Sequence, residues 1–407
     1  MQTNPPATSS TSGPTRLMSL DALRGFDMFW ILGADSIVHA LQQMSRNPAT
    51  NFLADQLTHK DWQGFAFYDL IFPLFVFIMG VSLVFSLSRE REQHGNAGAL
   101  KRIFRRFFLL YALGIFYYGG FANSFEQMRL VGVLPRIATA YLFAAILFTC
   151  FKARGLAIAC VTLLLGYWAL MANIPIRDID LDKEPLAVLA AQHGTTNAHE
   201  LYLRTTNYVS GVYDSGRNVA NHFDFLYLPG RKHDGNYDPE GLLSSIPAVA
   251  TALLGVLCGL LLRNPGIADA QKVRMLALGG VAAVALGWLW GIQFPVIKKI
   301  WTSSYALVAG GYSALLLALF YWLVEVRQLR RWTTPFVWIG TNAITVYLAN
   351  NLLDFDRVAN RLFGGEIKSA LNGALPGLGE LLIVAGGLSL GILFCGWLYR
   401  RKIFLRL

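Results

Sequence analysis

Charged residues are scarce in this chain. Only 15% of the 407 residues are Asp, Glu, Lys or Arg, whereas about a quarter is usual for a soluble protein. Hydrophobic residues make up 54%, and apolar runs recur along nearly the whole length. This composition excludes a soluble globular domain and also a soluble enzyme held by one membrane anchor. The net charge of +10 then reflects basic loops beside a membrane rather than nucleic-acid binding.

Motifs for metal, phosphate and nucleophile sites are also lacking. No Walker A, GxGxxG or GxSxG sequence is convincing, which removes the usual signatures of phosphate loops, dinucleotide binding and serine hydrolases. No CxxC spacing exists among the cysteines, which argues against a disulfide framework or a zinc site. We therefore expect no metal. The cysteines lie in or at apolar runs, at Cys150, Cys160, Cys258 and Cys395.

What the chain has in abundance is membrane-length apolar runs. A span needs about 20 residues, and backbone polar groups cannot stay unpaired in lipid, so each run should be a helix. We expect an all-α, polytopic membrane helix bundle of about ten transmembrane helices. Asp27 and Asp35 interrupt the first run. The runs cover residues 22–42, 66–88, 103–121, 130–150, 155–173, 242–262, 273–292, 304–325, 334–353 and 379–399.

Composition divides the chain into four parts. Residues 1–18 are rich in Pro, Ser and Thr without the apolar core of a signal peptide, and we expect a disordered cytoplasmic tail. Helices 1–5 occupy 19–173, and helices 6–10 occupy 242–407. The intervening 174–241 is polar and aromatic. A loop of that length is usually functional or disordered; its aromatics and carboxylates fit an ordered, sugar-binding lid, and an ordered structural cap fits equally well.

The orientation follows from the basic loops. With the N-terminus inside, short inner loops collect clusters such as Arg102, Arg105 and Arg106, and the positive-inside rule then places both termini in the cytoplasm. His59 falls on the outer side, at the mouth of the second span. Lys298 and Lys299 lie at an outer helix end, where we expect them to snorkel.

A polar group precedes the second span, where His59, Trp62 and Asp69 stand at the start of its apolar run. A titratable imidazole at the mouth of a membrane helix is a functional candidate. A hydrogen-bonded interfacial histidine is the alternative. Asp35, within the first span, must face a polar cavity or a partner. If it shares a cavity with His59, the two resemble a general base oriented by a carboxylate.

Other polar residues lie in or beside apolar runs. Arg136, inside the fourth span, needs a carboxylate or an anionic ligand, and a structural ion pair would also satisfy it. Arg24 could pair with Asp21 at the inner mouth of the first span. The remaining candidates have structural alternatives too, as helix caps or interhelical glue. They are Asp238 and Glu240, before the sixth span, and Asn342, in the ninth.

Six segments together resemble the heparan-α-glucosaminide N-acetyltransferase family. Each motif is weak alone, but they occur in the family's order over about residues 16–353. This chain lacks the extra outer domain and leading span of the lysosomal animal enzyme, so it looks like a bacterial relative. The segments are RLMSLDALRG at 16–25, HKDWQG at 59–64, DLIFPLFVFIMG at 69–80, GVLPR at 132–136, YDPEG at 237–241 and GTNAITVY at 340–347.

The resemblance implies a transmembrane acetyltransferase of the bacterial inner membrane. Such an enzyme takes acetyl-CoA, as co-substrate, from the cytosol and acetylates the amino group of a glucosamine at the outer side. The family's catalytic histidine falls on His59, which could act as base or as acetyl carrier. Its active-site asparagine falls on Asp35, a departure that leaves the acceptor in doubt. Arg24 and the basic inner loop could hold the CoA phosphates, and Arg136 could reach deeper polar groups.

Two other functions stay open. An outer-face glycan could be O-acetylated instead, or the chain could transport a sugar or anionic solute, with Asp35 and Arg136 on its pathway. The absence of a clear inverted repeat disfavours transport. The expected partners are acetyl-CoA, an amino-sugar or glycan acceptor and the lipid bilayer, with a homodimer as a possible assembly and no nucleic acid.

Overall fold

The computed structural model describes residues 17–122, 124–195 and 197–405. Most of the tail predicted at 1–18 therefore lies outside the described residues. Within them, seven helices are long and apolar enough to cross a membrane. The prediction of an all-α membrane helix bundle is confirmed. These helices are α4 (Phe67–Tyr117), α5 (Val133–Cys150), α6 (Ala153–Asn173), α10 (Ser245–Arg263), α11 (Asp269–Trp290), α12 (Ser303–Tyr321), which continues into the π-helix η4 (Trp322–Val326), and α17 (Leu378–Arg400).

Helix α4 contains two of the predicted spans. It is 51 residues long and is interrupted at Gly95, whose backbone (φ 67°, ψ −169°) is not helical. Glycine adopts a positive φ without the steric cost that other residues carry. The predicted spans 66–88 and 103–121 therefore belong to one interrupted element, with the predicted basic loop between them.

The two other predicted spans are broken helices. Span 22–42 consists of α1 (Met18–Phe29), the π-helix η1 (Trp30–Ala34) with Gly33 at φ 110°, and α2 (Asp35–Met44). Span 334–353 consists of α13 (Thr334–Thr341) and α14 (Ala343–Leu353), separated at Asn342. Irregular backbone at membrane depth is tolerated where it is buried in protein or lines a cavity. Both breaks occur beside polar residues that the sequence places inside spans.

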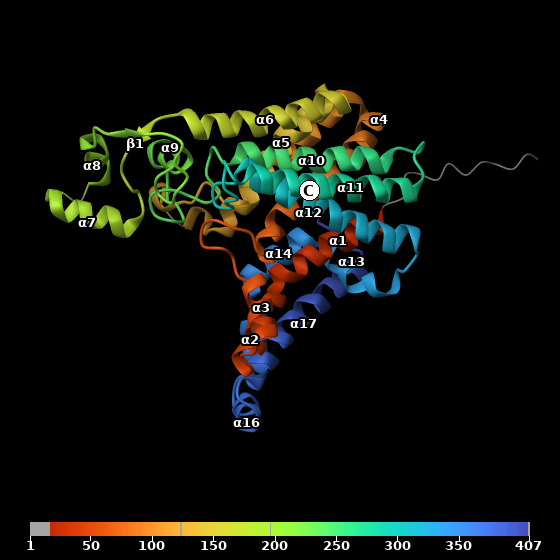
Figure 1. Ribbon diagram of the computed structural model, residues 1–407. Coiled ribbons are helices and arrows are strands. Elements are labelled where there is room, and N and C mark those ends of the chain that lie inside the picture. Colours follow the sequence, from red (N-terminus) through yellow and green to blue (C-terminus); the bar gives the residue numbers. More distant parts are fainter. Residues whose placement is uncertain (1–16, 123, 196, 406–407) are drawn as a thin grey trace, which may run out of the picture.

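Small residues let the helices approach closely. A Cβ added at Gly80 of α4 would lie 2.0 Å from the carbonyl oxygen of Ala252 on α10, and one at Gly340 of α13 would lie 1.9 Å from that of Asp21 on α1. Close packing of this kind holds helices together in lipid, where the hydrophobic effect does not. Helices α6, α10, α11 and α12 run side by side, and α1 packs against α12 and α13 (Figure 1).

The segment 174–241 forms a lobe at one end of this bundle (Figure 1). Strands β1 (Ile176–Arg177) and β2 (Tyr208–Val209) pair antiparallel. Helices α7 (Lys183–His193), α8 (Ala198–Arg204) and α9 (Val219–Tyr227) complete it, around a small core that includes Leu181, Leu201 and Phe225. We call it the outer lobe, and its end of the bundle the outer end, after the orientation that the basic loops predict.

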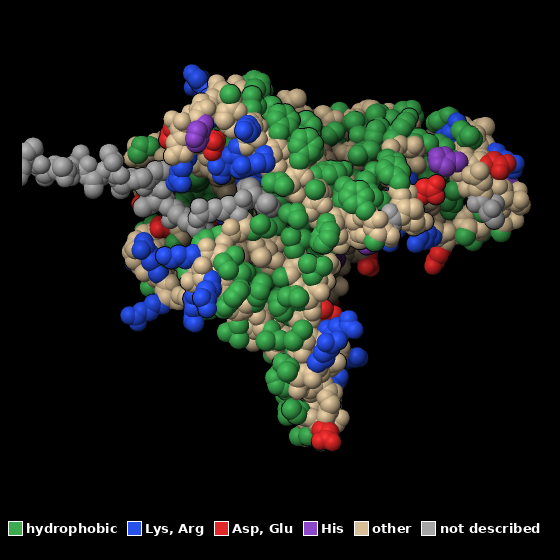
Figure 2. Space-filling view, turned by 180° about the vertical axis from the view of Figure 1, so that it is seen from behind, with side chains coloured by type: hydrophobic (Ala, Val, Ile, Leu, Met, Phe, Trp, Pro, Cys, Tyr) green, Lys and Arg blue, Asp and Glu red, His purple; other side chains and the backbone are tan. Residues whose placement is uncertain are grey.

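A side arm leaves the bundle (Figure 1). It consists of α2, α3 (Pro48–Gln56), α15 (Phe355–Phe363), α16 (Glu366–Ala374) and the first part of α17. Apolar side chains cover the middle of the bundle, and Lys and Arg gather at the end away from the outer lobe (Figure 2). This distribution is typical of a protein that spans a membrane. Short 3₁₀ turns lie in connections, at η2 (Gly120–Ala122), η3 (Phe125–Gln127) and η5 (Arg331–Thr333).

Candidate active site

The loop that carries His59 is fixed at the outer end by its neighbours. The backbone N–H of Gly64 donates to the carbonyl of Val296 (2.9 Å). The indole N–H of Trp62 donates to the carbonyl of Tyr213 in the outer lobe (2.8 Å). Trp62, a binding candidate from the sequence, thus ties the His59 loop to the outer lobe.

The imidazole of His59 is held by Asp69. Its Nδ1 lies 2.8 Å from Oδ1 of Asp69, which is buried as the third residue of α4. The second oxygen of Asp69 accepts hydrogen bonds from the backbone N–H groups of Ala66 (3.0 Å) and Lys60 (3.3 Å). A carboxylate at a helix N-terminus is favoured by the orphan N–H groups there. When Nδ1 donates its proton to Asp69, Nε2 carries the lone pair that base or nucleophile chemistry needs.

Lys298 completes this group. Its Nζ lies 2.9 Å from Nδ1 and 3.1 Å from Nε2 of His59, and 3.4 Å from Oδ1 of Asp69. Burial lowers the pKa of Lys298, while the carboxylates of Asp69 and Glu240 oppose that shift. The expectation that Lys298 snorkels was wrong, because a local sequence pattern does not show the buried carboxylate that the fold brings beside it.

A cavity of about 330 Å³ opens beside His59, a volume within the range of small-molecule sites. Its walls combine aliphatic and aromatic side chains, and the rings of Tyr117 and Tyr347 stack with centroids 4.6 Å apart. Its ionisable side chains other than tyrosine are His59, Glu240 and Lys298. We call it the outer cavity. Its lining is Met28, Ile31, His59, Tyr68, Ile71, Phe72, Phe75, Tyr117, Val133, Leu134, Ile137, Glu240, Lys298, Ala343, Ile344 and Tyr347.

Glu240 is positioned by a buried arginine that the sequence did not single out. Arg129 donates to both oxygens of Asp238 (2.9 and 2.7 Å) and to Oε2 of Glu240 (2.6 Å). Burial works against ionisation of Asp238, but the hydrogen bonds and charge of Arg129 hold its pKa below the ordinary value. Burial raises the pKa of Glu240. Asp238, a binding candidate from the sequence, therefore binds Arg129 and does not line the outer cavity. Of these two carboxylates, Glu240 is the one that lines it.

Arg136 contacts the segment that leads from Glu240 into α10, and it does not line the outer cavity. Its Nη2 donates to the carbonyl of Gly241 (3.3 Å) and to the hydroxyl of Ser244, and its guanidinium lies 5.0 Å from the ring centroid of Trp301. The side chain is 2% exposed. These contacts place Arg136 among groups of the protein at the start of α10.

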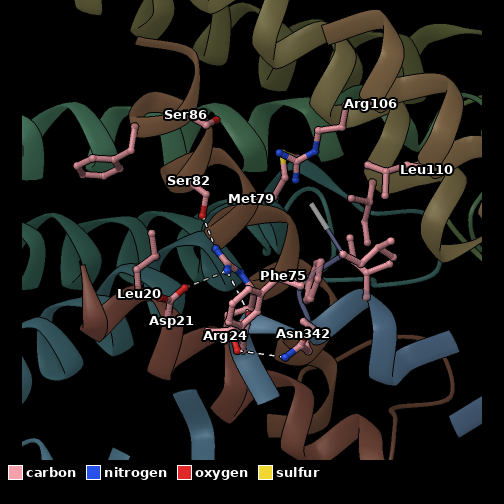
Figure 3. Close-up of a pocket in the computed structure, with 18 of the residues that line it drawn as sticks. Leu20, Asp21, Arg24, Phe75, Met79, Ser82, Ser86, Arg106, Leu110 and Asn342 are labelled. Atoms are coloured by element: carbon pink, nitrogen blue, oxygen red, sulfur yellow. Dashed lines mark hydrogen bonds and ion pairs between the residues drawn. The ribbon is translucent and has the colours of Figure 1, made fainter. Parts of the chain in front are cut away.

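A second cavity, of about 700 Å³, lies toward the other end of the bundle (Figure 3). Arg24 reaches into it and donates to Ser82 Oγ (2.6 Å) and to the carbonyl of Gly340 (3.3 Å), with Asp21 Oδ1 at 3.3 Å. Asn342 also lines it, and its Oδ1 has no hydrogen-bond partner among the described residues. We call it the inner cavity. Its basic residues are Arg24, Arg89, Arg102, Arg105 and Arg106.

The two cavities lie back to back. Five apolar residues line both of them, and we call this set the shared wall. It comes from α4, α5 and α14. The inner cavity is lined by arginines, whereas the outer cavity is lined by His59 and Lys298. The shared wall consists of Phe75, Leu134, Ile137, Ala343 and Ile344.

Residues 16–199 match a family model described as the catalytic region of heparan-alpha-glucosaminide N-acetyltransferase. The curated heparan-alpha-glucosaminide N-acetyltransferases of Homo sapiens and Mus musculus are each 28% identical over 333 residues, which is 73% of this chain and 49% of each relative. The chain is therefore similar to the heparan-α-glucosaminide N-acetyltransferase family over this region. It spans about half the length of the curated relatives it matches.

Within the heparan-α-glucosaminide N-acetyltransferase family match lie His59, Asp69 and Arg129, whereas Glu240 and Lys298 lie beyond its last residue. The fold brings both sets to one cavity. In the family resemblance, the position of Asp35 corresponds to an active-site asparagine. In the structure, Asp35 interacts with the hydroxyl of Tyr68, and the Tyr68 ring lies 4.6 Å from that of His59. The structure thus places Asp69, not Asp35, against the imidazole.

Proposed function

We propose that this protein is a transmembrane acetyltransferase that moves the acetyl group of acetyl-CoA from the inner side to an amino sugar at the outer side. One observation carries the proposal: a basic cavity and a cavity containing a held histidine meet at the shared wall. A transfer across the membrane needs a donor site and an acceptor site that meet at the reacting group. The similarity to the heparan-α-glucosaminide N-acetyltransferases supports the same reaction.

Acetyl-CoA occupies the inner cavity in this proposal. Its phosphates are multiply charged, and guanidinium groups bind phosphate oxygens bidentately. Arg24, Arg102 and Arg106 are among the basic residues that line this cavity. The thioester end would then point toward Phe75 and the rest of the shared wall. For the acetyl group to meet Nε2 of His59, side chains of this wall must move aside.

The acceptor occupies the outer cavity. Aromatic walls such as Tyr117 and Tyr347 suit the apolar face of a sugar ring. The carboxylate of Glu240 can accept hydrogen bonds from sugar hydroxyl or ammonium groups. A glucosamine-type ring held there presents its amino group toward His59. A sugar ammonium must first lose a proton, because only the neutral amine attacks a thioester. During the attack the amine nitrogen loses a second proton, and the neutral imidazole of His59 is suited to accept it.

The two aspartates near His59 should respond differently to substitution. Asp69→Asn removes the charge that orients the imidazole, and we expect kcat to fall about 10²-fold. Asp35→Asn changes a contact to Tyr68 and introduces the amide that the family pattern has there, so its kcat should stay within about tenfold. Steady-state kinetics of both purified variants checks this. A larger loss in Asp35→Asn than in Asp69→Asn would reverse the assignment.

The inner cavity predicts an effect confined to acetyl-CoA. Arg106→Gln removes one guanidinium from its lining, and we expect the KM for acetyl-CoA to rise about 10-fold or more, as for loss of a charged hydrogen bond. The KM for the acceptor should not change. Arg263→Gln is the matched control, because Arg263 is exposed, pairs with Glu92 and does not line the cavity. Equal effects of the two substitutions would contradict the placement of CoA.

The decisive assay uses purified protein in detergent with radiolabelled acetyl-CoA and a panel of amino sugars. Label in acid-stable amide linkage on a glucosamine supports the proposal. Label on hydroxyl groups would instead indicate O-acetylation. No label on any acceptor would overturn the enzyme assignment and favour transport of a sugar or anionic solute.

The proposal includes an orientation in a bacterial inner membrane with both termini in the cytoplasm. Reporter fusions after Arg91 and Arg330 should therefore score cytoplasmic, because both follow basic inner segments. A fusion within the outer lobe, after His193, should score external. A cytoplasmic signal from the outer-lobe fusion would contradict the sidedness and, with it, the direction of transfer.

A further inference from the structure

Lys298 is held in place more firmly than an exposed loop lysine. Its carbonyl accepts the backbone N–H of Trp301 (2.9 Å), and the indole N–H of Trp301 donates to Thr251 on α10 (3.1 Å). The backbone N–H of Ile297 donates to the hydroxyl of Thr302 (3.1 Å). Its side chain is 20% exposed, and it lines the outer cavity beside His59. The fold thus aims a cation at the place where His59 acts.

Asp69 does not need this cation to satisfy its oxygens. One oxygen faces Nδ1 of His59, and the other accepts two backbone N–H groups. An ammonium has three donors, and contact with Asp69 occupies one of them. Placing an amino group close to both ring nitrogens also carries a desolvation cost, which a purely structural lysine could avoid by pointing to water.

We propose that Lys298 is a catalytic residue whose ammonium stabilises the oxyanion formed at the acetyl carbonyl during transfer. The inference rests on the proposed function and adds the group that receives the developing charge. A carbonyl carbon that reacts beside Nε2 of His59 has its oxygen within reach of Nζ, which lies 3.1 Å from Nε2. A preorganised donor aimed at developing charge is commonly among the largest contributions to catalysis.

In direct transfer to the neutral amine, the amine lone pair forms the N–C bond, and the carbonyl π electrons move onto oxygen, beside Lys298. Collapse re-forms C=O and breaks the C–S bond, whose electron pair leaves on sulfur. The proton shed by nitrogen passes to Nε2 of His59 and from there to sulfur. The products are the N-acetyl sugar and CoA thiol.

The test compares three variants. Lys298→Met keeps the length of the side chain and removes the charge, and we expect kcat to fall about 10²–10³-fold, the scale for losing one oxyanion donor. The KM values for acetyl-CoA and acceptor should stay within about threefold. Lys298→Arg keeps a cation and should retain clearly more activity than Lys298→Met. Lys299→Met is the matched control, since Lys299 pairs with Asp234 of the outer lobe and does not line the cavity.

Each remaining outcome overturns the inference. Lys298→Met with wild-type kcat, or with a changed KM alone, excludes an oxyanion role. A purely structural ion pair predicts lower thermal stability of Lys298→Met without a selective loss of kcat in the folded fraction, and Lys298→Gln repeats the test if Lys298→Met does not fold. If both neutral variants fail to fold, Lys298 is structural. Inactive wild-type protein overturns the proposed function itself, whereas active wild type with an unimpaired Lys298→Met overturns this inference alone.

Discussion

His59→Ala is expected to lower kcat by about 10²–10⁴-fold, the usual contribution of a positioned general acid–base group. The imidazole is held through Nδ1 by a buried carboxylate, and it lines the outer cavity. Removing it takes away both the base and any acetyl carrier. The half-exposed side chain contributes little to the core, so the variant should elute and unfold like wild type. Initial rates with saturating acetyl-CoA and acceptor measure the effect.

His233 offers a matched control for this substitution. Its Nδ1 also lies 2.8 Å from a carboxylate, that of Asp234, but its side chain is 61% exposed and does not line the outer cavity. His233→Ala should therefore keep kcat within about twofold, as for a surface substitution. Near-wild-type activity of His59→Ala would refute the assignment of the active site.

Arg129→Met is expected to destabilise the protein by about 3–5 kcal/mol, the cost of breaking a buried ion pair by removing one partner. The guanidinium is 5% exposed and contacts two carboxylates, Asp238 and Glu240. Without it, the carboxylates of Asp238 and Glu240 lie together without the one cation that contacts both of them. A fall in the thermal unfolding midpoint of the detergent-solubilised variant measures the loss.

Two further proteins separate the charge effect from general disturbance. Arg204→Met removes an exposed arginine that pairs with Glu200 in the outer lobe, and such surface pairs contribute about 0–1 kcal/mol. Adding Asp238→Asn and Glu240→Gln to Arg129→Met removes the stranded charges and should restore much of the stability. If the thermal unfolding midpoint of the triple variant is no higher than that of Arg129→Met, repulsion between buried carboxylates is not the cause of the destabilisation.

The sequence predicted the helices better than it predicted their breaks. Long apolar runs identify helices, because backbone polar groups in lipid must be paired within the segment itself. Several such helices together predict a helix bundle. The interruptions at Gly33 and Asn342 depend on the cavities that the helices line. Asp35 and Asn342 were recognised as polar residues inside spans, but a single sequence does not show that the chain leaves the helix beside them.

The sequence singled out residues of the candidate site that are close together in the chain and missed residues that are distant. His59 and Asp69 are ten positions apart and were both singled out. Lys298 is 239 positions from His59, and Arg129 is 109 from Asp238. Both lie in connections, where a basic residue is ordinary. Only the packing of α4 against the later helices reveals that these two cations are buried beside acids.

The shared wall has a consequence for the membrane as an electrical insulator. A protein with a polar cavity open toward each side would conduct protons and ions if the cavities joined. The potential across the membrane would drive that leak at about 2.3 kcal/mol per charge for each 100 mV. Phe75, Leu134, Ile137, Ala343 and Ile344 separate the cavities with apolar side chains, and an apolar constriction excludes water and ions by dewetting. An acetyl group is neutral and small, so it can pass where a hydrated ion cannot. In the proposed function, the wall would let an acetyl group be transferred across the membrane while the membrane potential is maintained.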